Sequence, residues 1–360
     1  MKVFFIGIVI FYLSNNILGC WEKGERFALD YVLIFSLGLI LLGAEGFTNG
    51  VEWLGKKLRL TEGAVGSLLA AVGTALPETT IPIIAILTGG QDAGHEIGIG
   101  AILGAPFMLS TLAFFITGLA VIFSYRRRPN FPKMNLDINT LKRDLSFFLV
   151  IFTLAILASF LESHSSKQLI AGGLVIAYLI YAYLTLTKGS SVGEEGELNR
   201  LYLQRKAVNP SLILVLAQII LALGVIVGGA RLFVNEVEIL AQALGIPPFI
   251  LALIIAPIAT ELPEKFNSVI WVIRGKDTLA LGNITGAMVF QSSIIPAIGI
   301  TMTSWELTQG ALISAILTIL SSTLVLFEVH NKKYLTPFTL VNGGAFYIIF
   351  VILILKGFVH

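Results

Sequence analysis

The sequence predicts an all-α polytopic membrane protein with ten transmembrane helices in two inverted five-helix repeats, plus a short N-terminal apolar segment. Three observations lead to this prediction: the composition, ten apolar stretches of spanning length, and a polar motif that occurs once in each half. Of the 360 residues, 56% are hydrophobic and 13% are charged. Soluble domains carry about 25% charged residues, so this composition indicates a membrane protein.

Ten stretches are long and apolar enough to cross a bilayer, which takes about 20 helical residues. They lie near 29–51, 63–88, 97–123, 145–161, 169–187, 211–234, 247–273, 279–302, 307–327 and 337–355. A shorter apolar stretch fills residues 1–20. Its length is compatible with a signal-like segment or with an extra N-terminal helix.

Basic residues are distributed unequally between the two sets of alternate loops. Of the 24 Lys and Arg residues, seventeen lie in the loops of one set, which includes the central linker 188–210, and five lie in the other set. Cytoplasmic loops are rich in Lys and Arg. We therefore expect a multi-pass protein of the plasma (cell) membrane, with a solvated, flexible linker in the cytoplasm.

The two halves of the chain resemble each other. Residues 43–58 align with 229–244 at an offset of 186 (229 − 43 = 186), and the same offset places GTALPE on ATELPE. Each half holds five predicted spans, an odd number, so the halves must have opposite orientations. We expect a first repeat at 28–187 and a second at 211–360. Inverted repeats are typical of secondary transporters, whose sites lie at mid-membrane between the copies.

The repeated motif carries oxygen ligands. In each copy a threonine precedes a glutamate by four residues, as Thr74 and Glu78, and as Thr260 and Glu264. Residues four apart share a helix face, and the proline before each glutamate frees backbone carbonyls one turn earlier. Oxygen ligands of this kind suit hard cations such as Ca²⁺. Because carboxylates within a membrane are usually functional, the motif predicts a cation site between the halves.

Other classes of function are less favoured. The single cysteine, Cys20, and four scattered histidines lack the spacing of zinc or haem ligands. No cofactor and no nucleic-acid partner are expected, and the absence of a phosphate-binding GxxxxGK[ST] motif disfavours an ATP-driven pump. A cation channel and an intramembrane enzyme remain less favoured alternatives, and the sequence leaves the oligomeric state open.

With IGIGAILGAPF (97–107) and LGNITGAMVFQ (281–291), these motifs resemble the cation/Ca²⁺ antiporter superfamily, nearest its sodium/calcium exchanger branch. The resemblance implies ten helices and a cation site formed by the second and third helices of each repeat. It also implies that the first and sixth helices slide during alternating access. The ligands that it implies are Thr74, Glu78, Thr260, Glu264, Asn283 and Gln291.

The sequence also departs from the family pattern. The serine that follows the ligand threonine is replaced by Ala75 in one half and by Glu261 in the other. Because Glu261 precedes Glu264 by three residues, we expect the two to share a face and Glu261 to be a further ligand. The alternative is an ion pair of Glu261 with Lys265 or Arg231.

The expected function is secondary antiport of Ca²⁺ against Na⁺ or H⁺, with the lipid bilayer and these cations as the partners. Leu109 stands where the family has an acid or amide in the first half, so the site has fewer oxygen ligands than three sodium ions require. A monovalent cation/H⁺ antiporter is the alternative. Outside the motifs, we expect Arg126–Arg128 to anchor the topology at lipid headgroups, and Asp92, His95 and Glu96 to form an acidic external loop.

Overall fold

The computed structural model describes residues 23–57, 76–188, 199–207 and 209–358, and this part of the chain contains helices and no strand. Eight of the helices are long and apolar enough to cross a membrane. The all-α polytopic membrane fold is therefore confirmed. Two shorter apolar helices, Pro77–Thr88 and Pro248–Ile258, lie where the sequence predicts the second span of each half. The total of ten spans and the inverted repeats remain predictions, and the predicted segment 1–20 lies outside the described residues.

The described helices are distributed over both halves of the chain. In the first half they are α2 (Lys23–Lys57), α5 (Leu76–Thr88), α6 (Gln91–Met108), α7 (Phe114–Phe123), α8 (Ile138–Leu157) and α9 (His164–Lys188). In the second half they are α10 (Leu212–Leu244), α11 (Pro248–Thr260), α12 (Leu262–Ile273), α13 (Asp277–Met302), α14 (Gln309–Lys332) and α15 (Pro337–Leu355). Single turns occur as the π-helical η2 (Leu109–Ala113) and the 3-10 turns η3 (Tyr125–Arg127), η4 (Ala158–Phe160) and η5 (Tyr202–Gln204).

Several helix ends follow from local sequence. Asp137 precedes α8, and its carboxylate accepts hydrogen bonds from the backbone N–H groups of Asn139 and Thr140. Ser211 caps α10 in the same way. At the other end of α10, Gly245 adopts a left-handed conformation with φ of 62°, which glycine enters without a Cβ clash. Helix α10 therefore extends ten residues past the end of the predicted span 211–234 (244 − 234 = 10).

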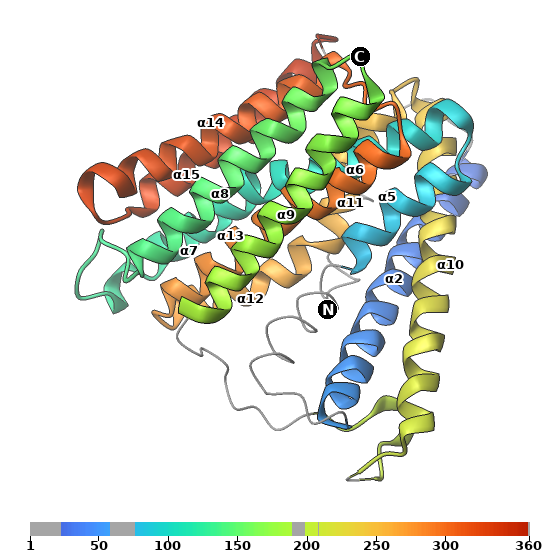
Figure 1. The fold of residues 1–360 in the computed structure, drawn as a ribbon, viewed down its shortest axis with the longest axis horizontal. Helices are drawn as coiled ribbons and strands as arrows, with labels where there is room; N and C mark the ends of the chain where they lie inside the picture. Colours follow the sequence, from blue (N-terminus) through green and yellow to red (C-terminus); the bar gives the residue numbers. More distant parts are fainter. Residues whose placement is uncertain (1–22, 58–75, 189–198, 208, 359–360) are drawn as a thin grey trace.

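Helices α2 and α10 pack along each other and form a pair at one side of the molecule (Figure 1). Close packing depends on glycine: a Cβ atom on Gly50 would lie 2.7 Å from Ile219 Cγ1. The described end of the linker is held against this pair. Trp53 Nε1 and Asn49 Nδ2 both donate to the carbonyl of Asn199, over 2.9 and 3.3 Å. The linker is therefore anchored at this end, although a flexible segment was expected.

The remaining helices form a bundle in which the two halves interpenetrate. Helix α13 of the second half contacts α8 and α9 of the first, while α6, η2 and α7 of the first half contact α14 and α15 of the second. The two halves therefore share one bundle. Most of the buried apolar side chains of these helices belong to one continuous core, whereas a second core lies between the α2–α10 pair and helices α5, α6 and α11.

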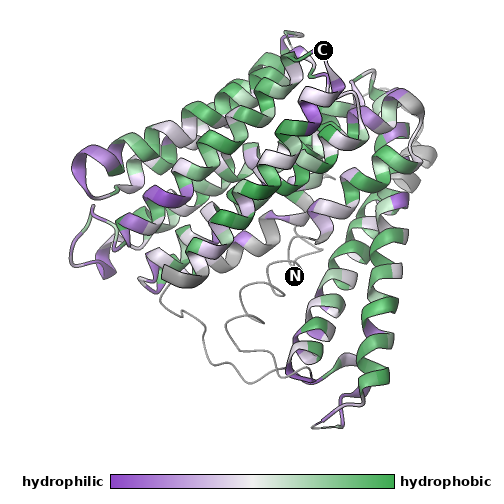
Figure 2. Cartoon of the chain, in the orientation of Figure 1, coloured by the Kyte–Doolittle hydropathy of each residue, from purple (hydrophilic) through white to green (hydrophobic). Residues whose placement is uncertain are grey.

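The helices are apolar along most of their length and more polar towards their ends (Figure 2). Large apolar side chains point outward from helices of both halves, among them Leu169, Ile176, Ile220, Phe327 and Ile348. In water such a surface would promote association. Exposed apolar side chains of this number suit a protein whose helices face lipid tails.

Candidate cation site

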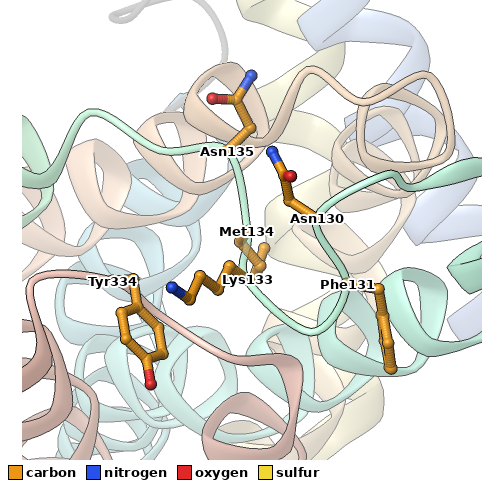
Figure 3. Close-up of a pocket in the computed structure, with 6 residues that line it drawn as sticks. All are labelled: Asn130, Phe131, Lys133, Met134, Asn135 and Tyr334. Carbon is orange, nitrogen blue, oxygen red and sulfur yellow. The ribbon is translucent and has the colours of Figure 1, made fainter.

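An open pocket of about 520 Å³ lies at the loop between α7 and α8 (Figure 3). Its lining consists of Asn130, Phe131, Lys133, Met134, Asn135 and Tyr334, none of which is a predicted ligand. Lys133 Nζ lies 4.7 Å from the centre of the Tyr334 ring, an arrangement that places a positive charge in the pocket. A positively charged lining repels cations, so the candidate cation site is elsewhere.

The helices that carry the predicted ligands pack together. Helix α6 contacts α5, α11 and α13, and α5 also contacts α11 and α13. Glycines bring α6 close to its neighbours: a Cβ atom on Gly100 or Gly104 would collide with the carbonyl oxygens of Phe249 and Leu253 on α11. On its other side, a Cβ on Gly98 would lie 2.6 Å from a side-chain atom of α5. The glycines of this third-helix motif therefore hold both second helices of the repeats against α6.

The second helix of the second half is interrupted within its motif. Helix α11 ends at Thr260, α12 begins at Leu262, and Glu261 lies between them. A proline in the first turn of α12 lacks an N–H, which explains the interruption. The Thr260 hydroxyl donates to the carbonyl of Ala256 over 3.0 Å, so one of the carbonyls expected to be free is used within the helix.

Glu78 and Thr260 are both buried. Glu78 is 6% exposed and lies in the first turn of α5, where the helix dipole favours a negative charge. Thr260 is 1% exposed at the end of α11. Thr74 lies outside the described residues, and Glu264 belongs to α12 but its side chain lies outside the described part. The roles predicted for Thr74 and Glu264 therefore remain predictions.

Glu261 forms an ion pair with Lys265, one turn later on α12. The Nζ atom of Lys265 lies 3.7 Å from Glu261 Oε2, and both side chains are buried. The sequence left two partners open for Glu261, and the structure contains the pair with Lys265. Arg231, the other candidate, has an exposed side chain on α10. The carboxylate of Glu261 therefore lies inside the protein next to a positive charge from the same helix.

Asn283 and Gln291 lie at different depths on α13. Asn283 Nδ2 donates to Ser268 Oγ on α12 over 3.2 Å. Gln291 lies eight residues further along α13 than Asn283, away from the α12–α13 turn. Eight helical residues span about 12 Å, so Asn283 lies nearer this turn than Gln291.

Gln291 offers an oxygen to this region. Its side chain is 3% exposed, and its Oε1 has no hydrogen-bond partner among the described residues. A buried amide oxygen without a partner costs about 1–3 kcal/mol. An amide oxygen is also a normal ligand for a hard cation. The orphaned oxygen of Gln291 is therefore compatible with the predicted ligand role.

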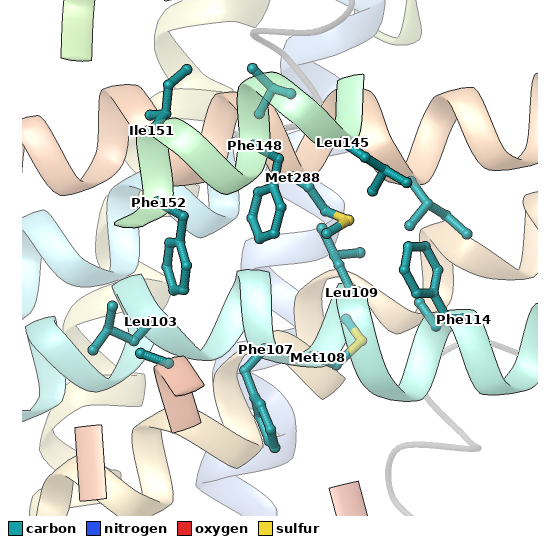
Figure 4. Packing of buried hydrophobic residues seen from close by; sticks show 14 of the residues in the cluster. Leu103, Phe107, Met108, Leu109, Phe114, Leu145, Phe148, Ile151, Phe152 and Met288 are labelled. Atoms are coloured by element: carbon teal, nitrogen blue, oxygen red, sulfur yellow. The ribbon is translucent and has the colours of Figure 1, made fainter. Parts of the chain in front are cut away.

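The equivalent position in the first half is apolar. Leu109 begins the π turn η2 and lies in the apolar core with Phe148 and Met288 (Figure 4). It offers no oxygen ligand, as the sequence suggested. The two halves therefore contribute unequally to any site between them.

The structure also contains a buried carboxylate that sequence reasoning missed. Asp144 of α8 accepts hydrogen bonds from Tyr181 on α9, over 3.1 Å, and from Thr285 on α13, over 2.9 Å. It also pairs with Arg143 at 3.0 Å. Asp144 directly precedes the predicted span 145–161, and its place on α8 follows only from the structure. Its satisfied hydrogen bonds indicate that it fixes α13 against α8 and α9.

Two expectations for polar segments were wrong. The anchor role is wrong for Arg128, which forms a buried ion pair with Asp277 at the start of α13, with an N–O distance of 2.7 Å. Arg126 and Arg127 are exposed, and their role as anchors stays a prediction. Residues 91–96 are the first turns of α6 and not a loop. Helix α6 begins earlier than expected because its polar first turns are still helical, beyond the apolar stretch that was used to predict it.

Four of the predicted ligands are buried in the described part of the chain: Glu78, Thr260, Glu261 and Gln291. No three of His, Cys, Asp or Glu lie close enough to hold a metal ion among the described residues.

Comparisons with known proteins agree with this reading of the fold. A family model described as sodium/calcium exchanger protein matches residues 31–187 and 214–356. An uncharacterized membrane protein of Methanocaldococcus jannaschii is 26% identical over 307 residues, which cover 83% of this chain and 90% of that protein. A sodium/calcium exchanger of Methanosarcina acetivorans is 24% identical over 290 residues, which cover 71% and 78% of the two chains.

A solved structure has a similar fold. The crystal structure of an H⁺/Ca²⁺ exchanger superimposes with a TM-score of 0.69 over 99% of this chain and 89% of that chain, at 16% sequence identity. At this identity the likeness concerns the fold alone. It supports the order of the helices in space and leaves the choice of cation to the residues of the site.

Proposed function

Because this chain belongs to the sodium/calcium exchanger family, whose model matches most of both halves, we propose that it is a secondary antiporter that exchanges Ca²⁺ for Na⁺ or H⁺. The observation that carries the proposal is the packing of α5, α6, α11 and α13 around the motifs, together with the burial of Glu78, Thr260 and Glu261. Members of this family are transporters and not enzymes.

The proposed site binds the cation between the two halves. Glu78, Glu261 and Glu264 supply carboxylates, and Thr74 and Thr260 supply hydroxyls. Gln291 adds its amide oxygen from α13, and Asn283 lines the approach from the α12–α13 turn.

Exchange requires Ca²⁺ and the monovalent ions to compete for the same carboxylates. A ligand shifts a conformational equilibrium only through its differential affinity for the two states. The proposed moving part is the α2–α10 pair, which has a small core of its own and packs on α5, α6 and α11 through a second core, both distinct from the main core of the bundle. Sliding of this pair would expose the site to the two sides of the membrane in turn.

The proposed orientation places the linker 188–210 in the cytoplasm of a plasma-membrane protein, between a first repeat at 28–187 and a second at 211–360. The distribution of Lys and Arg supports it. A Ser190→Cys variant on a Cys20→Ser background tests it. An impermeant thiol reagent added to intact cells should leave the introduced thiol unlabelled, and labelling from outside would reverse the orientation.

A monovalent cation/H⁺ antiporter is the second candidate. The apolar environment of Leu109 favours it, because one oxygen ligand is missing from the first half. Fewer ligands weaken binding of a divalent ion more than that of a monovalent ion, since Ca²⁺ takes 6–8 oxygen ligands.

Uptake of ⁴⁵Ca²⁺ into proteoliposomes containing the full chain separates these candidates. Uptake driven by an outward Na⁺ or H⁺ gradient, and absent from protein-free liposomes, would support Ca²⁺ exchange and identify the counter-ion. Na⁺/H⁺ exchange without Ca²⁺ uptake would support the second candidate. Flux of one cation with no dependence on a counter-ion would contradict both and indicate a channel.

A further inference from the structure

Lys265 places a positive charge on α12, one of the helices that are proposed to supply cation ligands. Its side chain is 6% exposed, that of Glu261 is 1% exposed, and the two are one turn apart on α12. Lys265 also directly follows Glu264 in the sequence. A lysine at this place competes with any cation that the neighbouring carboxylates attract.

Stability alone does not explain the Glu261–Lys265 pair. Taking two charges out of water is costly, and replacing a buried ion pair by apolar residues is often neutral or stabilising. Charged residues within membrane helices are rare and usually functional. The pair therefore points to a role in the transport site.

Glu261 and Lys265 both lack a charged counterpart at the equivalent positions of the first half. At the offset of 186, Glu261 corresponds to Ala75 (261 − 186 = 75) and Lys265 corresponds to Thr79 (265 − 186 = 79). One half has both charges and the other has neither. The pair as a whole adds no net charge, whereas either residue alone would change the charge of the site by one.

Among the described residues, the helices α7, α11 and α13, which contact α12, offer no other basic side chain that could place a positive charge beside the proposed ligands. Helices α7 and α11, which contact α12, contain no charged residue. The one charge on α13 is Asp277, which pairs with Arg128. Within this group of helices, Lys265 is the single cation near the proposed ligands.

We propose that Lys265 is a resident cation that determines the charge of the transport site and thereby its stoichiometry, an inference that rests on the proposed function. Three carboxylates (Glu78, Glu261, Glu264) and one ammonium give a net charge of −2. One divalent ion or two monovalent ions neutralise this charge. The exchange of Ca²⁺ against two monovalent ions then moves no net charge across the membrane.

Removal of the ammonium changes this balance. In Lys265→Gln the three carboxylates give a net charge of −3, and a third monovalent ion fills the site on the return step. One elementary charge then moves per cycle. In the double variant Glu261→Gln/Lys265→Gln the net charge is again −2. Its Ca²⁺ transport should therefore be independent of membrane potential, even if the transport rate is lower.

The experiment measures ⁴⁵Ca²⁺ accumulation in proteoliposomes at membrane potentials set with K⁺ and valinomycin. Wild type and the double variant should accumulate Ca²⁺ independently of potential. Accumulation by Lys265→Gln should change by about 50-fold per ~100 mV, as expected for one elementary charge. Potential-independent accumulation by Lys265→Gln, or equal potential dependence in Lys265→Gln and the double variant, would overturn the proposal.

A second measurement separates this proposal from the proposed function. The half-stabilising concentrations of Ca²⁺ and Na⁺ are determined from the thermal unfolding of the purified chains in detergent. Lys265→Gln should need about tenfold less of the bound ion than wild type, because an opposing charge has gone, and the double variant should need more than Lys265→Gln, because it also loses the Glu261 carboxylate. If Ca²⁺ does not stabilise any of the three chains, the proposed function fails. The half-stabilising concentrations of Na⁺ for wild type and the two variants then still test the role of Lys265. Equal concentrations for all three would overturn it.

Discussion

Gly43 of α2 and Gly229 of α10 make the same contacts with each other's helices. A Cβ atom on Gly43 would lie 2.7 Å from Ile226 Cγ1, and one on Gly229 would lie 3.0 Å from Ile40 Cγ1. The pairs are exchanged by the repeat offset, because 229 − 43 and 226 − 40 both equal 186. Neither position has room for a side chain, so the two helices cross at a pair of glycines.

Gly43→Ala and Gly229→Ala should therefore weaken the α2–α10 contact to a similar degree. Overpacking of this kind costs about 1–3 kcal/mol, which thermal unfolding of the purified chains measures. Gly38→Ala and Gly224→Ala are matched controls, since they are on the same helices, obey the same offset and have nothing within 4 Å of an added Cβ. Equal stability of all four variants would contradict a close crossing.

Gln218 joins the end of the linker to α2. Its Nε2 donates to Asn49 Oδ1 and to the carbonyl of Gly46, each over 2.9 Å, and its Oε1 accepts from the backbone N–H of Leu203 over 3.0 Å. Gln218→Leu should leave these groups unsatisfied and cost about 1–3 kcal/mol.

Limited trypsin digestion checks this contact, because Arg200 and Arg205 flank the docked segment. Cleavage there should be faster in Gln218→Leu than in wild type. Tyr202→Phe, which removes only the hydrogen bond from the Tyr202 hydroxyl to Glu45, should have a smaller effect. Unchanged cleavage in Gln218→Leu would show that other contacts hold the linker.

Arg128 should matter far more for stability than its neighbours. It donates to both oxygens of Asp277, over 2.7 and 2.8 Å, and to the carbonyl of Val272 over 2.5 Å. Arg128→Gln leaves a buried carboxylate without its cation, which typically costs about 3–5 kcal/mol. Arg127→Gln, on an exposed side chain, should change stability by less than about 0.5 kcal/mol. Similar midpoints in thermal unfolding would contradict this assignment.

Asp137 should make a pH-dependent contribution to the start of α8. The Thr140 hydroxyl, and then the backbone N–H groups of Thr140 and Asn139, donate to its carboxylate and lower its pKa below the ordinary 3.8, although partial burial opposes this shift. Since the folded-state pKa is the lower one, the stabilisation is complete above 3.8 and is lost as the pH falls through the folded-state pKa.

The variant Asp137→Ala measures this contribution. It should lower the unfolding free energy by about 0.5–2 kcal/mol at neutral pH, the usual cost of losing a helix N-cap. The difference from wild type should shrink in acid, below pH 3.8. A difference that stays constant down to the acid limit would show that the charge of Asp137 is not involved.

The fold class could be predicted from the sequence because membrane helices are apolar along their whole length. The repeat offset aligned Gly43 with Gly229, but the contacts of these glycines follow only from the structure. Helix ends were harder to predict: α10 continues to Leu244, beyond the predicted end at 234, because the stop signal is the left-handed Gly245. The π turn η2 was not predicted, since its sequence, LSTLA, has no local signal for it.

Within the site, local relations were predictable and distant ones were not. The pair of Glu261 with Lys265 was an open alternative because residues four apart on a helix are neighbours. The inward position of Asp144 depends on Thr285 and Tyr181, which are distant in sequence. Asp277, the partner of Arg128, is also distant in sequence. The run of three arginines was therefore interpreted as a surface anchor.

The most direct test of the account is the initial rate of ⁴⁵Ca²⁺ uptake into proteoliposomes by Glu78→Gln and Glu264→Gln. One glutamate comes from each half, and a shared site requires both. Each variant should lose uptake by about 100-fold or more while its thermal unfolding is little changed, because a neutral amide cannot replace a charged ligand. Glu162→Gln, on an exposed loop carboxylate, should transport normally. Normal uptake by either Glu78→Gln or Glu264→Gln would contradict a cation site shared by the two halves.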